Sequence, residues 1–172
     1  MTQVRDAIRG DDTRERPSYL IRPGRPGDSY ELSFHWGELR APSQMRVLDR
    51  YFDEIDRGIQ GCQVALAQPG GELVGQVWTR YRNIDPGIAD GRTECYVHTL
   101  FVMEKYRRQG IARALVEAAS TAVSRFGRSV MVIGVDRPNE YARKLYEKWD
   151  FHQFHATNDL RGDLIFLCRR LF

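Results

Sequence analysis

The residues with the clearest chemical potential are two arginines and a glycine in the run RRQGIA, at 107–112. An apolar stripe with helical spacing begins directly after Gly110, so the run lies where a helix is expected to start. A helix N-terminus has unpaired amide N–H groups and a partial positive charge. Gly110 lets a ligand approach the backbone, Ala112 keeps the next position small, and the arginines add full charges. This combination suits a pyrophosphate group.

The same run also fits a capped surface helix with solvated arginines. The Walker lysine is absent, which argues against nucleotide triphosphate hydrolysis. Context favours the phosphate-binding interpretation, because a strand is predicted at 94–102 just before the run and an amphipathic helix at 110–126 just after it. Gly127 is expected to end that helix.

The surrounding elements alternate in a regular order. Strands are predicted at 19–22, 62–68, 73–82, 94–102, 129–135, 151–156 and 164–170, and helices are expected to begin near 28, 42, 110 and 136. Asp28 is expected to cap the first helix, which would place Leu32, Trp36 and Leu39 on one face. The order predicts an α/β fold with a mixed, mostly antiparallel central sheet, a parallel βαβ crossover and flanking helices. We expect a flexible tail at 1–17 and one domain at 18–172.

Composition narrows the class of protein further. The chain has 172 residues, and its net charge of +3 is too small to argue for nucleic acid. Its apolar runs are far shorter than the roughly 20 residues of a membrane span, and no secretory signal is visible. Three cysteines, Cys62, Cys95 and Cys168, have no metal-site spacing. We interpret them as reduced strand residues of a cytoplasmic protein without a metal site.

Two segments carry a family resemblance: LFVMEKYRRQGIARALVEAA and, later in the chain, NEYARKLYEKWDF. They resemble the acyl-CoA-binding motif and the following motif of the GNAT N-acetyltransferase superfamily. The resemblance implies acetyl-CoA as co-substrate, held between two splayed central strands, 95–102 and 129–135. It implies the cofactor-binding residues Leu100, Phe101, Val102, Arg107, Arg108, Gln109, Gly110, Ile111, Ala112, Arg113 and Asn139. Asp150 stands where the family commonly has glycine, which is expected to alter the turn there.

Three residues are candidates for the chemistry that the resemblance implies, direct attack of an amine on the thioester in a ternary complex. Tyr146 matches the family's tyrosine that hydrogen-bonds the CoA sulfur, although an aromatic on an apolar helix stripe also fits the core. His98 is a candidate base, because histidine titrates nearest neutral pH, and it equally fits a satisfied strand histidine. Strand alternation predicts that His98 shares a face with Leu100. Glu94 is a candidate base acting through water.

The acceptor amine stays open at this stage. In the family its site is built by the first two helices, the loop at 83–93 and the final hairpin. Acidic residues beside aromatics in these regions suit a cationic amine, but they also fit solvated faces and core packing. The acceptor is a small molecule or a protein amine. A non-catalytic acyl-CoA-binding or sensing domain is the alternative, and homodimerisation is left open.

Overall fold

The computed structural model describes residues 18–34, 42–159 and 162–172. The tail predicted at 1–17 lies outside these residues, as do Trp36 and Leu39 of the predicted first helix. Within them, no helix is long and apolar enough to cross a membrane.

The regular elements follow the predicted order, with boundaries that differ by a few residues. The strands are β1 (Tyr19–Pro23), β2 (Gln60–Ala67), β3 (Leu73–Arg80), β4 (Glu94–Val102), β5 (Val130–Asp136), β6 (His152–Asp159) and β7 (Gly162–Arg170). The helices are α1 (Ser29–Phe34), α2 (Pro42–Asp56), α3 (Ile111–Arg125) and α4 (Glu140–Glu147). The strands of the last hairpin extend into the segment expected to be a turn, and α4 begins later than the position expected near 136.

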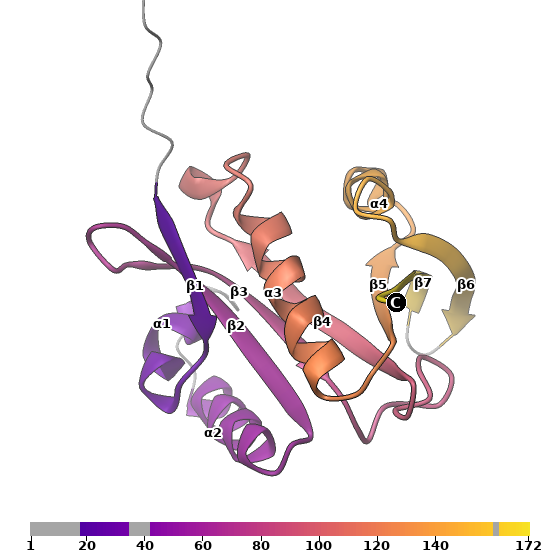
Figure 1. The fold of residues 1–172 in the computed structure, drawn as a ribbon, viewed down its shortest axis with the longest axis horizontal. Helices are drawn as coiled ribbons and strands as arrows, with labels where there is room; N and C mark the ends of the chain where they lie inside the picture. Colours follow the sequence, from indigo (N-terminus) through magenta and orange to yellow (C-terminus); the bar gives the residue numbers. More distant parts are fainter. Residues whose placement is uncertain (1–17, 35–41, 160–161) are drawn as a thin grey trace, which may run out of the picture.

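The strands form one seven-stranded sheet in the order β1-β2-β3-β4-β5-β7-β6. Every neighbouring pair is antiparallel except β4 and β5, which are parallel and are joined by α3 (Figure 1). A parallel pair needs a crossover connection, and the apolar stripe of α3 makes this helix suited to cover the sheet. The predicted fold class is therefore confirmed.

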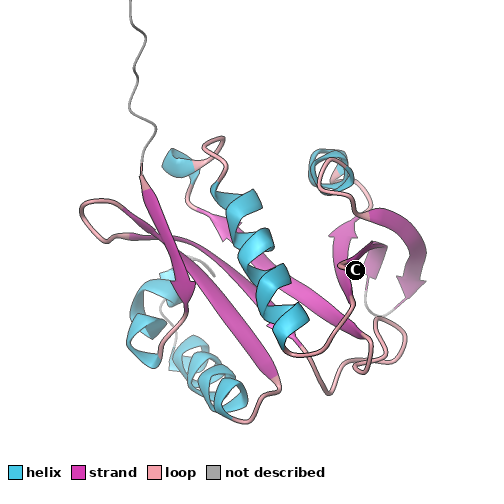
Figure 2. Ribbon diagram, viewed as in Figure 1, coloured by secondary structure: helices cyan, strands magenta, loops and turns pink. Residues whose placement is uncertain are grey.

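The two faces of the sheet are covered differently. On one face, α3 lies across the strands of the first half of the sheet and α4 lies near β5 (Figure 2). Leu115 and Val123 of α3 and Tyr146 of α4 pack there in one large apolar cluster. On the opposite face, α1 and α2 cover Trp78 through Leu32 and Phe52. Strands β2 and β3 therefore present alternate side chains to two separate cores.

Beta4 and β5 run side by side over only part of their length. Their pairing covers Glu94–Val97 against Val130–Ile133 and stops there, so the two strands diverge toward their carboxyl ends. Beta5 pairs instead with β7 along its whole length. The resulting fork lies at the middle of the sheet, where the parallel crossover begins.

A β-bulge in β4 lies at this fork. His98 pairs with Trp78 and Phe101 with Gln76, so Thr99 and Leu100 together oppose a single residue of β3. Thr99 has a φ of 51°, which is uncommon for a β-branched residue. The bulge shifts the alternation, and the prediction that His98 and Leu100 share a face is wrong. Leu100 packs with the α3 cluster, whereas His98 lies against Trp78 on the other face.

Two local predictions about turns have different outcomes. Gly127 has a φ of 79° and ends α3 as expected, with Arg128 N–H donating to Val123 O. The prediction that Asp28 caps the following helix is wrong. Its carboxylate turns back to accept from Arg25 N–H at 2.7 Å and from the Arg22 guanidinium at 2.7 and 2.8 Å. Arg22 supplies a charged donor, which is stronger than neutral amides.

Candidate acyl-CoA site at the strand fork

A cavity of about 530 Å³ lies beside the fork, on the α3 side of the sheet. The carboxyl end of β4, the loop at 103–110, the start of α3 and the inner face of α4 enclose it. Its lining includes all of the predicted cofactor-binding residues except Gln109, together with Tyr146; the further lining residues are Tyr106, Tyr141, Ala142, Leu145 and Trp149. The fold thus brings together two segments that lie about 30 residues apart in the chain.

The loop before α3 presents unpaired backbone N–H groups to this cavity. Gly110 is the N-cap residue, with a φ of 84°, and no side chain caps the helix. The first intrahelical bond at this end is donated by Ala114 to Gly110 O, so the preceding N–H groups of the first turn have no helical acceptor. Arg108 also has a positive φ, 63°. Successive backbone N–H groups in such a turn converge on one point and favour an anion.

The arginines of the loop have separate roles in this arrangement. Arg107 Nε donates to Val102 O at 3.0 Å, which ties the loop to the end of β4. Arg108 and Arg113 are exposed at the cavity and add charge beside the free amides. Gln109 does not line the cavity, because its amide turns back to Lys105 O at 3.4 Å. The predicted phosphate-binding run therefore forms one surface, with Gln109 outside it.

Val102 presents its backbone to the side from which β5 has separated. Met103 N–H donates to Val74 O at 2.9 Å, so the Met103–Val74 pair is hydrogen-bonded. Hydrogen-bonded and non-hydrogen-bonded pairs alternate in an antiparallel ladder. Val102, opposite Gly75, therefore directs its N–H and C=O away from β3. The Val102 carbonyl already accepts a hydrogen bond from Arg107. The Val102 N–H is left as a fixed donor at the cavity.

Tyr146 is placed by the start and the end of its helix. At the start, Asn139 Oδ1 accepts from Ala142 N–H at 3.1 Å, so Asn139 is the N-cap of α4. At the end, Phe151 N–H donates to Tyr146 O, and Asp150 takes the left-handed conformation, with a φ of 64°, that usually favours glycine. Asp150 therefore keeps the turn, contrary to the expected alteration. Burial, and to a smaller extent the neighbouring Tyr96, raises the pKa of Tyr146 to about 12.

His98 lies on the opposite face of the fork, outside the cavity. Its ring is stacked between Trp78 and Tyr96, at centroid distances of 6.4 and 6.1 Å. Nδ1 lies 3.0 Å from Thr99 Oγ1, whereas the buried Nε2 has no hydrogen-bond partner within the described part of the chain. Burial, with a further contribution from Arg80, lowers the pKa of His98 to about 4. The imidazole is therefore neutral at pH 7.

Glu94 lies at the start of β4, far from the fork. Its carboxylate accepts from the N–H of Asp90 at 3.0 Å and so holds the loop before the strand. Four residues of extended strand, roughly 13 Å, separate it from His98. The structure does not bring Glu94 to the cavity.

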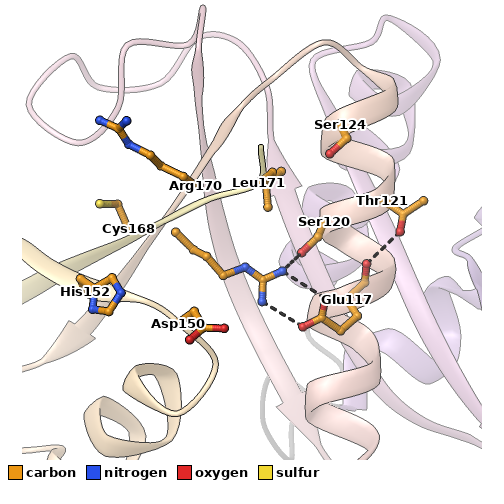
Figure 3. Close-up of a pocket in the computed structure, with 10 residues that line it drawn as sticks. Glu117, Ser120, Thr121, Ser124, Asp150, His152, Cys168, Arg170 and Leu171 are labelled. Atoms are coloured by element: carbon orange, nitrogen blue, oxygen red, sulfur yellow. Dashed lines mark hydrogen bonds and ion pairs between the residues drawn. The ribbon is translucent and has the colours of Figure 1, made fainter.

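A larger cavity, of about 680 Å³, lies between the carboxyl half of α3 and β7 (Figure 3). Arg169 is the central charge there. Its guanidinium is paired with Glu117 at 2.9 Å, donates to Ser120 Oγ and Trp149 O, and lies over the ring of Phe151. These contacts join α3 to β7 and to the end of α4. These hydrogen bonds hold elements of the fold together, and they use the guanidinium N–H groups that could otherwise bind a ligand.

In the described ranges, no group of three or more His, Cys, Asp or Glu side chains is placed to hold a metal ion. The cysteines are free; Cys62 and Cys95 are buried, and Cys168 is half-buried. Burial raises the pKa of Cys95 to about 12. A thiol with such a pKa stays protonated and is a poor nucleophile.

Known proteins share this fold and these motifs. The profile of the acetyltransferase (GNAT) family matches residues 29–151. An N-acetyltransferase from Staphylococcus aureus Mu50 superposes with a TM-score of 0.72 at 18% identity, over 90% of this chain and 99% of that chain. The yncA protein of Salmonella typhimurium, solved with its cofactor acetyl-CoA, gives 0.71 at 18% identity, over 90% and 94%.

A chimera of the spermidine N-acetyltransferase SpeG from Vibrio cholerae and hSSAT gives a TM-score of 0.69 at 16% identity, over 89% of this chain and 95% of that chain. Among curated proteins, none matches the sequence significantly. At these identities the solved structures establish a common fold, and the family match carries the assignment.

Proposed function

Because the chain belongs to the acetyltransferase (GNAT) family, we propose that it transfers the acetyl group of acetyl-CoA to a primary amine of a small molecule or a protein. The observation that carries this proposal is the cavity at the fork. One end of it has free helix amides and arginines for a pyrophosphate, and the other has Tyr146 and the Val102 N–H for the thioester. A single elongated ligand with both groups fits this distribution.

The residues of the cavity divide the binding of acetyl-CoA between them. The N–H groups at 110–113, with Arg108 and Arg113, would hold the pyrophosphate. The carboxyl end of β4 would align the pantetheine arm along the fork. The Val102 N–H would donate to the thioester oxygen, on which negative charge develops as the amine attacks.

Tyr146 would donate a hydrogen bond to the CoA sulfur as it leaves. A phenol with a pKa near 12 stays protonated at pH 7 and holds its proton more tightly than a thiol of pKa about 8.5. We therefore assign Tyr146 a hydrogen bond to the sulfur that stabilises the developing thiolate. As the amine nitrogen bonds to the carbonyl carbon, the carbon–sulfur bond breaks and the amine proton passes to solvent. The CoA thiolate takes up a proton from solvent and leaves as the thiol.

His98 would orient the amine. An imidazole with a pKa near 4 is too weak a base to retain the proton of an amine with a pKa of about 10.4. Its neutral Nε2 is buried, so it could accept a hydrogen bond from the attacking amine, which must itself be neutral, only after the side chains around it move. Glu94 would need a chain of water molecules of roughly 13 Å to reach this point. We therefore give the positioning role to His98.

We propose direct transfer in a ternary complex, which the lining of the cavity supports. None of the described residues that line it is a cysteine, serine or threonine, and burial raises the pKa of Tyr146, one of its tyrosines, to about 12. An acetyl-enzyme would require a better nucleophile. Isolation of a stable acetylated protein in the absence of an amine would contradict this mechanism.

The decisive experiment is calorimetric titration of acetyl-CoA into the parent protein and into an Arg108→Glu, Gly110→Asp variant. We expect the double variant to lose about a hundredfold or more in affinity, because it places two carboxylates where the pyrophosphate binds. Arg125→Glu is the matched control, since it changes an exposed charge at the far end of α3. Release of thiol with a panel of amines then tests transfer. Binding without release for every amine would leave a non-catalytic acyl-CoA-binding domain.

A further inference from the structure

Glu72, in the hairpin between β2 and β3, contacts the phosphate-binding loop at 103–110 from outside the cavity. Its carboxylate accepts a hydrogen bond from the Tyr106 hydroxyl at 2.6 Å and from Lys105 Nζ at 2.9 and 3.1 Å. Both donors belong to the loop, 33 and 34 residues further along the chain. None of these three side chains has a role in the proposed reaction.

The hairpin that carries Glu72 is fixed to the sheet at its base. Ala67 N–H donates to Glu72 O at 2.8 Å, and Gly71 N–H donates to Ala67 O at 2.7 Å. Gln68 N–H donates to O of Ser18, the residue before β1, at 2.8 Å. Because these bonds join the hairpin to the ends of β1 and β2, the backbone of Glu72 has a defined position relative to the sheet.

The loop at 103–110 has few other connections to this part of the sheet. Met103 N–H donates to Val74 O at 2.9 Å, at the end of β4. Beyond Met103, the hydrogen bonds of the loop to other described residues stay within the loop, return to β4 or continue into α3, apart from those to Glu72. Glu72 therefore supplies the tie between the middle of the loop and the first half of the sheet.

Tyr106 connects this tie to the acyl-CoA cavity. Its ring lines the cavity and packs against the large apolar cluster, and its hydroxyl donates to Glu72. Lys105 Nζ lies 4.9 Å from the centroid of the same ring. The hydrogen bonds from Tyr106 and then Lys105 lower the pKa of Glu72, so the carboxylate is ionised at pH 7.

The charge of Glu72 and its position have opposite effects on acyl-CoA. A carboxylate beside the loop repels phosphate groups, and it neutralises the ammonium of Lys105, which could otherwise attract them. Electrostatics alone therefore predicts that removal of Glu72 tightens acyl-CoA binding. The geometry predicts weaker binding, because Tyr106 would lose the acceptor that fixes its ring in the cavity wall.

We propose that Glu72 is a positioning residue for acyl-CoA, which acts through the Tyr106 hydroxyl to hold the phosphate-binding loop in the conformation that receives the pyrophosphate. The proposal rests on the acyl-CoA binding proposed above. Glu72 does not line the cavity, so its effect falls on the affinity for acyl-CoA and not on the transfer step. Tyr106 is then a further residue of the acyl-CoA site, placed there by a hydrogen bond to a hairpin that is distant in the sequence.

Calorimetric titration of acetyl-CoA into the parent protein and into Glu72→Ala, Tyr106→Phe and Glu72→Gln tests this role. We expect Glu72→Ala and Tyr106→Phe each to raise the Kd about three- to tenfold, as for the loss of one hydrogen bond. The double variant should lose no more than about the larger single loss, because both changes remove the same bond. Glu72→Gln keeps an oxygen that accepts from Tyr106 and should stay within about twofold of the parent. Asp56→Ala, an exposed acid at the end of α2, is the control and should not change the Kd.

Steady-state kinetics separate positioning from a general loss of folded structure. In Glu72→Ala the KM of acetyl-CoA should rise, while kcat at saturating acetyl-CoA stays within about twofold of the parent. A tighter or unchanged Kd in Glu72→Ala, or a fall in kcat without a rise in KM, would overturn the positioning role. A Glu72→Gln variant as weak as Glu72→Ala would overturn the route through Tyr106.

Hydrogen–deuterium exchange of the loop, without any ligand, decides the role of Glu72 separately from acetyl transfer. The N–H groups of Tyr106 and Arg107 donate to Met103 O and Glu104 O, so release of the loop should speed their exchange about threefold or more. If the parent protein does not bind acetyl-CoA, the proposed function fails. Faster exchange in Glu72→Ala and Tyr106→Phe, but not in Glu72→Gln, would still support Glu72 as the residue that positions the loop. Equal exchange in all four proteins would overturn it.

Discussion

The buried histidine at the fork makes the stability of the fold depend on pH. His98 is stacked between Trp78 and Tyr96, and its Nε2 has no partner among the described residues. Protonation would place an uncompensated charge in this environment, which is why burial lowers the pKa of His98 to about 4 from an ordinary value of 6.5. Acidification is therefore expected to lower the free energy of unfolding of the protein.

The magnitude follows from the difference between the folded and unfolded pKa values. Below pH 6.5 the unfolded chain takes up a proton at His98, whereas the folded chain does so only near pH 4. The unfolded state therefore binds more protons across this window, and the free energy of unfolding falls as the pH falls. The interval spans about 2.5 pH units at about 1.4 kcal/mol each, which gives a loss of about 3 kcal/mol between pH 7 and pH 4.

Urea denaturation of the parent protein and of His98→Phe and His98→Gln, at several pH values from 4 to 7, measures this loss. His98→Phe keeps a flat ring between Trp78 and Tyr96, and His98→Gln keeps a neutral polar group. Carboxylates such as Asp28 titrate equally in all three proteins, so the difference between parent and variant isolates His98. We expect the difference in free energy of unfolding between parent and variant to change by about 3 kcal/mol between pH 7 and pH 4. The value for the parent should fall more in acid than that of either variant. A difference that is independent of pH would refute the reasoning.

Three further predictions concern α4 and its surroundings. Tyr146→Phe should reduce turnover about 10- to 100-fold while the Kd of acetyl-CoA measured by calorimetry stays within about twofold; unchanged turnover would exclude the hydrogen bond to sulfur. Asp150→Gly should raise the free energy of unfolding by about 1 kcal/mol, because it relieves a left-handed φ of 64°, whereas Asp150→Ala should give no such gain in the same urea titration. Arg169→Met should lower it by about 2 kcal/mol through the lost bonds to Ser120 and Trp149, and Arg170→Met, on the exposed neighbour, should have little effect.

The order of the elements was predictable because each one has its own local signal. The α3 stripe repeats at helical spacing from Ile111 to Phe126, and the Gly127 turn requires the positive φ that glycine supplies. The phosphate-binding run was predictable for a similar reason, since its meaning depends only on the strand before it and the helix after it. Such signals are contained within about 20 residues of sequence.

Features that depend on partners distant in the chain were not predictable in this way. Asp28 has the right type and position to cap a helix, and nothing in the local sequence shows that Arg22 competes for its carboxylate. Asp136 follows an apolar strand and precedes a helix, so the sequence interprets it as a boundary residue. Its place two residues after Gly134, whose lack of a side chain makes room for the Tyr96 hydroxyl, follows from the parallel pairing of β4 with β5, and that pairing is a property of the sheet.

The bulge at Thr99 explains how one strand places His98 and Leu100 on opposite faces of the sheet. Without it, strict alternation would put His98 and Leu100 on the same face, and the backbone beyond them would stay in phase with the first half of the strand. The extra residue reverses that phase, so that β4 turns His98 toward Trp78 and Leu100 toward the cavity. A φ of 51° at a β-branched residue costs conformational free energy, and no pattern in the neighbouring sequence predicts this conformation. The strain at Thr99 therefore accompanies the change of phase that puts His98 and Leu100 on opposite faces of β4.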